Sequence, residues 1–458
     1  MRAWLKGALL AALVFGACWG CAIFYWQATD SMFATSDLVL YLLALPLALL
    51  LAFWLGSKLI ASRAAAPAIA APAQSTKAGA LLLAPPPLAI LAASLRSPHG
   101  ASVEELSAAI ADNKARADLD QELVDDDGFP VMTARSGDAT DEALQEDIGE
   151  WLSRNGMPEL RFSDEQWRAL TLASAVVDDL ASHAASNMIP SAGSPPMLQL
   201  VPILPAEWPI EQRRAFGMWL KHTVDQSGWP HANITVAPEV TAENRTPSAV
   251  LGRLAHDAGA TNVPLAAMIV ACASHIGDES VAQLAASSSL FTSSHPQGLI
   301  PGEGAAGLLV TDLAQARSIE GAAFALLDPV SEARRDSSAD DTRRADPKLL
   351  GELVQRALKH APAELSEVAM MLADTGHRSN RVLELMGLAS AAMPQLDGAT
   401  DVMCIGAATG SCGIVPFMTA LALAHHHALE GAAPVLCISN EDPYRRCATL
   451  VRPAASLA

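Results

Sequence analysis

Two long apolar runs open the chain, at residues 7–26 and 38–56. Each is close to the ~20 residues that a helix needs to span a bilayer. The polar segment between them contains two acidic residues and no basic one, whereas Lys or Arg flanks both outer ends. Because basic residues favour the cytoplasmic side, we expect residues 1–60 to form a transmembrane hairpin with both ends in the cytoplasm of a bacterial inner membrane. A cleaved signal peptide is the alternative for the first run.

After an Ala/Pro-rich linker at residues 61–80, short apolar runs alternate with amphipathic segments. Residues 164–184 show a helical apolar face, and Ser102 with Glu105 forms the capping-box pattern at the start of another helix. Buried strands are predicted at residues 87–95, 197–205, 265–274, 366–374, 434–439 and 447–453. The pattern occurs twice, so residues 81–458 are predicted to form a layered α/β domain of two similar halves.

The net charge and the positions of the cysteines exclude some classes of function. The formal net charge of −19 argues against a nucleic-acid partner, because phosphate binding needs a basic face. Polar stretches at residues 111–150 and 331–347 are interpreted as surface insertions or loops. Five cysteines after the N-terminal runs lie in apolar segments without metal-ligand spacing, so we expect buried, reduced thiols and neither a metal nor a cofactor. They are Cys272, Cys404, Cys412, Cys437 and Cys447.

The run GEGAAG contains Gly302, Gly304 and Gly307 in a G-x-G-x-x-G pattern. A dinucleotide loop needs a strand before the glycines and a helix after them. Here Pro301 and a polar run precede the motif, and a short apolar run follows it. We therefore predict a glycine turn that lets two backbones approach closely before a buried strand at residues 305–310.

Three segments together resemble the β-ketoacyl synthase branch of the thiolase-like fold. They are SVEELSAAI at residues 102–110, FTSSHPQGLIPGEGAAGLLV at 291–310 and GAATGSCG at 406–413. The resemblance covers about residues 85–453. It implies a thiolase-like layered fold of two related halves, and it is compatible with a homodimer.

The catalytic residues that this resemblance implies are not in place. The family chemistry needs an activated cysteine and two histidines that stabilise an oxyanion. The motifs place Asp374 and Ala407 at the two histidine positions. Cys272 lies in an A-C-A-S run, but only 29 residues separate it from Gly302, which fits a later strand. The resemblance places the nucleophile near Glu239 instead. We therefore expect no catalysis; if the chain is active after all, Cys272 and His377 are the candidates.

A second histidine feature is the run of three at residues 425–427 in a predicted helix. Consecutive helical residues point about 100° apart, so we expect these side chains not to share one metal ion.

The resemblance and the membrane runs together favour a binding role. We expect a non-enzymatic adaptor that presents a protein partner. Related proteins act as adaptors for effectors of bacterial type VI secretion. The predicted binding surface comprises Glu239, Asp374, His377, Ala407 and Ser411. Docking on residues 111–150 is the alternative location. Two other functions stay open: a divergent synthase or acyltransferase acting on membrane-proximal acyl-thioesters, and an acyl-binding module without turnover.

Overall fold

The computed structural model describes residues 85–189, 195–238, 246–260, 263–319, 321, 323–341 and 345–454. The chain divides into two units, Met1–Leu83 and Ala84–Ala458, and the described residues all belong to the second. The predicted transmembrane hairpin and the linker lie outside the described residues. Among the residues described, no helix is both long enough and apolar enough to cross a membrane.

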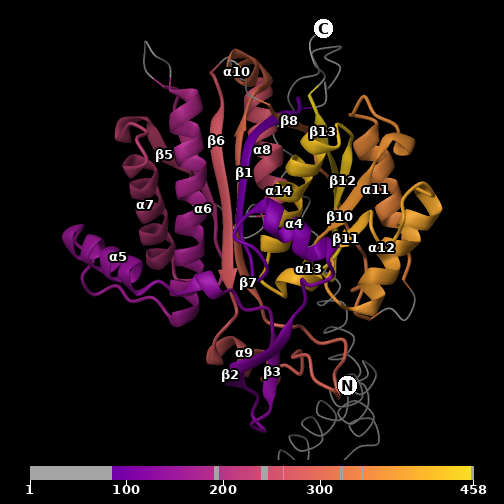
Figure 1. Cartoon of the computed structure of the whole chain (residues 1–458), viewed down its shortest axis with the longest axis horizontal. Coiled ribbons are helices and arrows are strands. Elements are labelled where there is room, and N and C mark those ends of the chain that lie inside the picture. The colour runs from indigo at the N-terminus through magenta and orange to yellow at the C-terminus, as the bar shows by residue number, and fades with distance from the viewer. Residues whose placement is uncertain are drawn as a thin grey trace, which may run out of the picture. The chain divides into compact units, whose positions relative to one another are not determined.

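One mixed β-sheet runs through the domain and contains the same strand arrangement twice (Figure 1). The strands of the first half are β1 (Leu88–Arg96), β4 (Leu198–Ile203), β5 (Ile234–Val236), β6 (Ala266–Ser274) and β7 (Glu303–Thr311). Those of the second half are β8 (Ala325–Leu327), β10 (Met370–Ala373), β11 (Val402–Cys404), β12 (Val435–Ser439) and β13 (Arg445–Pro453). Counted along the chain, the spatial order in each half is third, second, fourth, fifth, first.

The fifth strand of each half is antiparallel to its neighbours, and the two first strands, β1 and β8, pair antiparallel where the halves meet. Each half therefore has the same topology, and the prediction of an α/β fold with two related halves is confirmed.

Helices cover the two halves and fill the space between them (Figure 1). The outer face of the first half packs against α6 (Asp164–Met188) and α7 (Ile210–Gln226), and that of the second half against α11 (Lys348–Leu358) and α12 (Ser379–Ala392). A third core lies between the halves, where α8 (Pro247–Ala260) and α14 (Val415–Glu430) pack together with α4 (Val103–Ala111). The remaining described α-helices are α5 (Glu142–Arg154), α9 (Asp278–Ala286), α10 (Leu313–Ser318) and α13 (Ile405–Thr409).

Small residues allow close contact between the layers. All residues of β6 and β7 are buried, as predicted for residues 305–310. A Cβ on Gly307 would lie 2.7 Å from Leu180 Cδ1 on α6, and one on Gly304 would lie 3.0 Å from the carbonyl oxygen of Arg96 on β1. Both glycines therefore lie where a larger residue would push a helix or a strand away.

Residues 111–150 are largely exposed, as expected for a surface insertion, but they are more ordered than a loop. They contain a hairpin, β2 (Asp118–Val124) and β3 (Pro130–Thr133), and most of α5. Leu123 and Val131 form a small core with α9, and Ile148 belongs to the core beneath α6. The sequence pattern did not reveal this packing, because only every third residue of β2 is buried and acidic residues surround the buried positions.

The described residues of the stretch 331–347 are likewise packed into the domain; residues 342–344 lie outside the described residues. They begin with β9 (Ser331–Arg334), which pairs with β13. Ser338 and Ala339, which follow, are buried.

Candidate functional site

The loops that follow the strands of the second half surround a small recess of about 40 Å³. Four of the five predicted binding residues line this recess: Asp374, His377, Ala407 and Ser411. The fifth, Glu239, lies outside the described residues. The sequence motifs thus mark positions that the fold brings together.

Asp374 follows β10 directly, and its carboxylate is held by the turn between β12 and β13. Oδ2 accepts a hydrogen bond from Ser439 Oγ at 2.5 Å, and Oδ1 accepts from the backbone N–H groups of Asn440 at 2.8 Å and Glu441 at 3.1 Å. Burial raises the pKa of Asp374 to about 6, against the opposing effect of these hydrogen bonds. The carboxylate is therefore engaged within the protein, and it is not an exposed charge for a partner.

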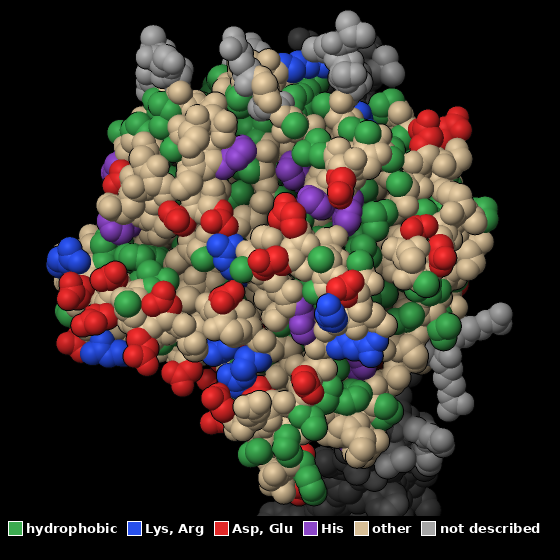
Figure 2. All heavy atoms as spheres, in the orientation of Figure 1, with side chains coloured by type: hydrophobic (Ala, Val, Ile, Leu, Met, Phe, Trp, Pro, Cys, Tyr) green, Lys and Arg blue, Asp and Glu red, His purple; other side chains and the backbone are tan. Residues whose placement is uncertain are grey.

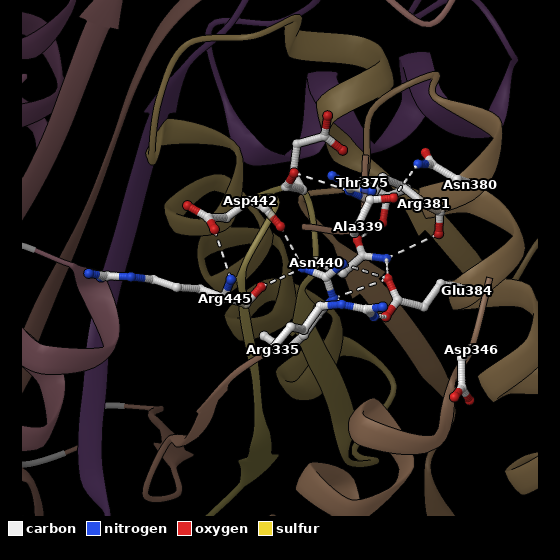
Figure 3. A network of polar contacts seen from close by, with 12 residues as sticks. Arg335, Ala339, Asp346, Thr375, Asn380, Arg381, Glu384, Asn440, Asp442 and Arg445 are labelled. Carbon is white, nitrogen blue, oxygen red and sulfur yellow. Dashed lines mark hydrogen bonds and ion pairs between the residues drawn. The ribbon is translucent and has the colours of Figure 1, made fainter. Parts of the chain in front are cut away.

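A buried polar network fixes the same turn from its other side (Figure 3). Asn440 accepts a hydrogen bond from Thr375 Oγ1 at 2.6 Å and donates one to the carbonyl oxygen of Arg381 at 3.0 Å. Glu384 accepts from Arg335 Nη1 at 3.1 Å and Arg446 Nε at 3.0 Å. This network joins α12, β13 and the segment after β9, so the recess has a rigid wall.

The opposite side of the recess offers little chemistry. Burial lowers the pKa of His377, and its ring meets Phe291 edge-on at a centroid distance of 5.0 Å. Ala407 has no polar side-chain atom. A Cβ on Gly406 would overlap the carbonyl oxygen of Asp374, so the two loops are in direct backbone contact. The space left is of the order of one water molecule.

None of the five described cysteines lines the recess. Cys272 lies on the outer face of β6 in the core beneath α6, and burial raises the pKa of its thiol. The structure therefore does not bring Cys272 together with His377. Cys404 is half-buried nearby, where burial and the carboxylates of Glu441 and Asp374 raise its pKa to about 11. Cys412 is buried and its pKa is raised to about 12. These thiols are protonated at neutral pH and poor nucleophiles.

Sequence reasoning missed the role of Glu303 in the GEGAAG run. This side chain is fully buried and bonds Arg168 of α6 through two nitrogens, at 2.5 and 2.8 Å. It also accepts hydrogen bonds from Ser274 Oγ and from the backbone N–H of Ser136. A Cβ on Gly302 would overlap the carbonyl oxygen of Thr409. The run is therefore a structural junction between β7, α6, the segment after β3 and the second half.

A larger cavity, of about 580 Å³, lies at the ends of β4 and β5 in the first half. Its lining is mainly apolar, with Ile203, Leu204, Met218 and Val250 among its residues, and three arginines also line it. They are Arg213, Arg214 and Arg253. Sequence analysis did not predict this cavity, because its lining comes from four separate segments and no motif marks it.

The β2–β3 hairpin exposes apolar side chains among acids. Leu119, Val124 and Phe129 have exposed fractions of 57, 51 and 66%. Hydrophobic side chains gather at the lower end of the described domain, where the hairpin projects (Figure 2). The base of the hairpin is fixed, since Asp120 bonds Arg135 at 2.8 and 2.9 Å and Thr133 at 2.7 Å. This is an ordered apolar surface rather than a loose loop.

No family model matches the chain, and no curated protein gives a significant match. Solved structures do match: the described domain has a thiolase-like ketosynthase fold. The ketosynthase from module 6 of the bacillaene synthase of Bacillus subtilis 168 is similar with a TM-score of 0.55 and 11% identity, covering 80% of this chain and 72% of that one. The ishigamide ketosynthase/chain length factor gives a TM-score of 0.51 and 18% identity, covering 81% and 100%. A Streptomyces albus oxazolomycin ketosynthase domain gives 0.54 and 11%, covering 81% and 75%. At these identities the likeness concerns the fold.

Proposed function

We propose that this chain is a ketosynthase-fold protein that binds a protein partner without catalysing condensation. The observation that carries this proposal is the recess at the ends of the second-half strands. Asp374 and Ala407 stand there, at the positions that the sequence resemblance assigns to two histidines, and the recess holds about 40 Å³. A condensing enzyme needs a thiolate and hydrogen-bond donors aimed at a developing oxyanion, and it needs room for a thioester.

The β2–β3 hairpin is the proposed docking surface. Its exposed apolar residues lie beside the exposed acids Asp118, Glu122, Asp126 and Asp127. Exposed apolar groups rimmed by charge are typical of protein interaction sites, and the acids favour a partner segment with basic and apolar side chains. We place the partner here rather than on Asp374, because that carboxylate is buried and already hydrogen-bonded.

The role proposed for this binding is that of an adaptor at a secretion machine, with a type VI secretion effector as the partner. The predicted tether at residues 1–60 would hold the domain at the inner membrane. The sequence resemblance and the two N-terminal apolar runs support this part of the proposal.

A pull-down with the full-length chain tests the docking surface. The double variant Leu119→Ser/Phe129→Ser should lose the captured partner without a change in melting temperature, because both side chains are exposed. Leu383→Ser on α12 is the matched control, since Leu383 is exposed to 62%. Equal capture by the hairpin variant and the parent would place the interface elsewhere.

Incubation with acyl-thioesters tests the absence of catalysis. We expect no covalent adduct by intact-mass measurement, because the pKa of Cys272 is raised by burial. A mass increase of one acyl group that disappears in Cys272→Ala would instead support the divergent synthase or acyltransferase.

A second candidate function is acyl binding without turnover, and the first-half cavity favours it. A volume of about 580 Å³ is in the range of small-molecule sites, and its apolar wall with arginines suits a chain that carries an anionic head. Displacement of a fluorescent fatty acid measures this binding. Gly217→Leu should fill the cavity and abolish displacement, and Arg214→Glu should weaken it. Arg317→Glu on the surface of α10 should have no effect. Parent-like binding by the first two variants would exclude this cavity.

A further inference from the structure

Two histidines and a glutamate meet on one side of the last turn of α14. One ligand atom from each of His426, His427 and Glu430 lies within 4.8 Å of the other two. His426 Nε2 is 3.4 Å from Glu430 Oε2, and His427 Nδ1 is 4.0 Å from the same oxygen. Although neighbouring side chains of a helix point about 100° apart, both imidazoles bend toward the glutamate one turn later.

The outward nitrogen of each ring lies near a polar side chain of α4. His426 Nδ1 lies 3.6 Å from Glu104 Oε1, and His427 Nε2 lies 3.1 Å from Ser107 Oγ. Each imidazole thus has one nitrogen facing Glu430 and the other facing a polar side chain of α4. Metal-bound histidines in proteins commonly show this arrangement, in which a carboxylate or hydroxyl orients the ring and selects its tautomer.

We propose that His426, His427 and Glu430 bind a Zn²⁺ ion, with Glu104 and Ser107 as positioning residues. Two nitrogens and one carboxylate oxygen suit Zn²⁺, whereas Mg²⁺ and Ca²⁺ prefer oxygen ligands alone. At Zn–N and Zn–O distances of about 2.0–2.2 Å, two ligands of a tetrahedral site lie about 3.3 Å apart. The two His–Glu distances of 3.4 and 4.0 Å lie near that value. The ligand atoms of the two histidines lie within 4.8 Å of each other, so side-chain rotations bring the three ligands to the ion.

The remaining coordination position faces solvent. The side chains of Glu430 and Glu104 are 69 and 68% exposed, whereas His426 and His427 are 25 and 13% exposed. Histidine side chains appear beside acidic ones on the face that α4 covers (Figure 2). The third residue of the run, His425, does not take part, because its buried ring lies near Ile90 and His183. Three protein ligands and one open position allow a water molecule or an exogenous ligand to complete the site.

Titration of the untagged, chelator-treated full-length chain with Zn²⁺ tests the proposal. We expect saturable one-to-one binding by calorimetry and a rise in melting temperature, because an ion that binds the folded chain and not the unfolded one stabilises the fold. Co²⁺ should give the intense visible absorption of a four-coordinate site, which Zn²⁺ then removes. His426→Gln and Glu430→Gln should abolish the absorption.

Two further variants separate a metal site from a cluster of surface ion pairs. Glu104→Gln should lower Zn²⁺ affinity about 10–100-fold while keeping the Co²⁺ absorption, as expected for a residue that orients a ligand. His360→Gln, an exposed histidine elsewhere, should bind like the parent. No saturable binding by the parent chain would overturn the proposal, as would equal affinities of His426→Gln, Glu430→Gln and His360→Gln.

Discussion

The second strand of each half leads into a different kind of space. In the first half, β4 ends at a cavity of about 580 Å³; in the second half, β10 ends at a recess of about 40 Å³. The strand order around the two is identical. The two halves thus share the framework of strands but not the volume enclosed at their ends.

The residues at the two strand ends explain the difference. After β10, the buried carboxylate of Asp374 draws the β12–β13 turn inward, and Gly406 lets the next loop touch its backbone. After β4, the facing residue of α7 is Gly217, and a Cβ there would meet only side chains, at 3.2 Å from Val236. One site is closed by hydrogen bonds, and the other is bounded by apolar side chains that can move. For this reason we assign catalysis to neither the cavity nor the recess. Of these two spaces, we assign small-molecule binding only to the first-half cavity.

The largest effect should come from Gly406→Ala in the closed recess. The new methyl group would overlap the carbonyl oxygen of Asp374 and lie 2.9 Å from the carbonyl carbon of Thr375, so backbone must shift. We expect a loss of about 3 kcal/mol or more in the free energy of unfolding, measured by urea denaturation. Gly252→Ala in α8, which has no atom near its Cβ, is the control and should change stability by about 1 kcal/mol or less. Equal stabilities would show that the recess is looser than described.

A smaller effect, with a definite pH dependence, should come from Asp374→Asn. The folded-state pKa of Asp374 is raised from 3.8 to about 6, so between these values the folded chain holds a proton that the unfolded chain releases. The contribution of Asp374 to stability is therefore present below pH 4 and is lost as the pH rises through 6. The Asn variant has no titrating carboxyl group at this position. The difference in the free energy of unfolding between variant and parent should therefore shift by about 2–3 kcal/mol in favour of the variant from pH 4 to pH 7.

Parallel slopes of unfolding free energy against pH for parent and Asn variant would contradict this assignment. Asp374→Lys is a useful companion, because it places a cation among buried groups without a counter-charge. It should lower the melting temperature strongly, which means that charge reversal at this position cannot serve as a clean test of partner binding.

The smallest effect should come from Gly217→Ala beside the open cavity. Replacing a glycine in a helix interior by alanine gains up to about 1 kcal/mol, and the neighbouring Val236 side chain can yield to the added methyl group. We expect a stability equal to or slightly above that of the parent in the same urea assay. A loss as large as that of Gly406→Ala would remove the contrast between the two sites.

The sequence predicted the strands better than it predicted what surrounds them. Apolar runs such as the one at residues 265–274 identify buried strands, since every residue of β6 is buried. The hairpin β2–β3 was missed because its acidic residues conceal two buried positions, Leu123 and Val131. The ion pair between Asp120 and Arg135 fixes the hairpin, and the hydrophobic periodicity of the sequence does not reveal this contact.

The candidate site was likewise predicted only in part from the sequence. Family-like motifs located the recess around Asp374 and Ala407, but they did not show that the Asp374 carboxylate is satisfied internally. The first-half cavity and the convergence of His427 on Glu430 come from side-chain directions and distant segments. Local sequence patterns carry no information on either.

The position of β1 in the sheet has a consequence for synthesis on the ribosome. This apolar strand pairs on one side with β7 and on the other with β8, from Arg96 with Ala305 to Leu88 with Leu327. Its partners follow more than 200 residues later in the chain, and translation at about 5–20 residues per second delays them by roughly 10–50 s. During that time both edges and both apolar faces of β1 lack their native neighbours. The first strand of the described domain to emerge is thus among the last to be completed, and the nascent chain has a long interval in which chaperones can act on it.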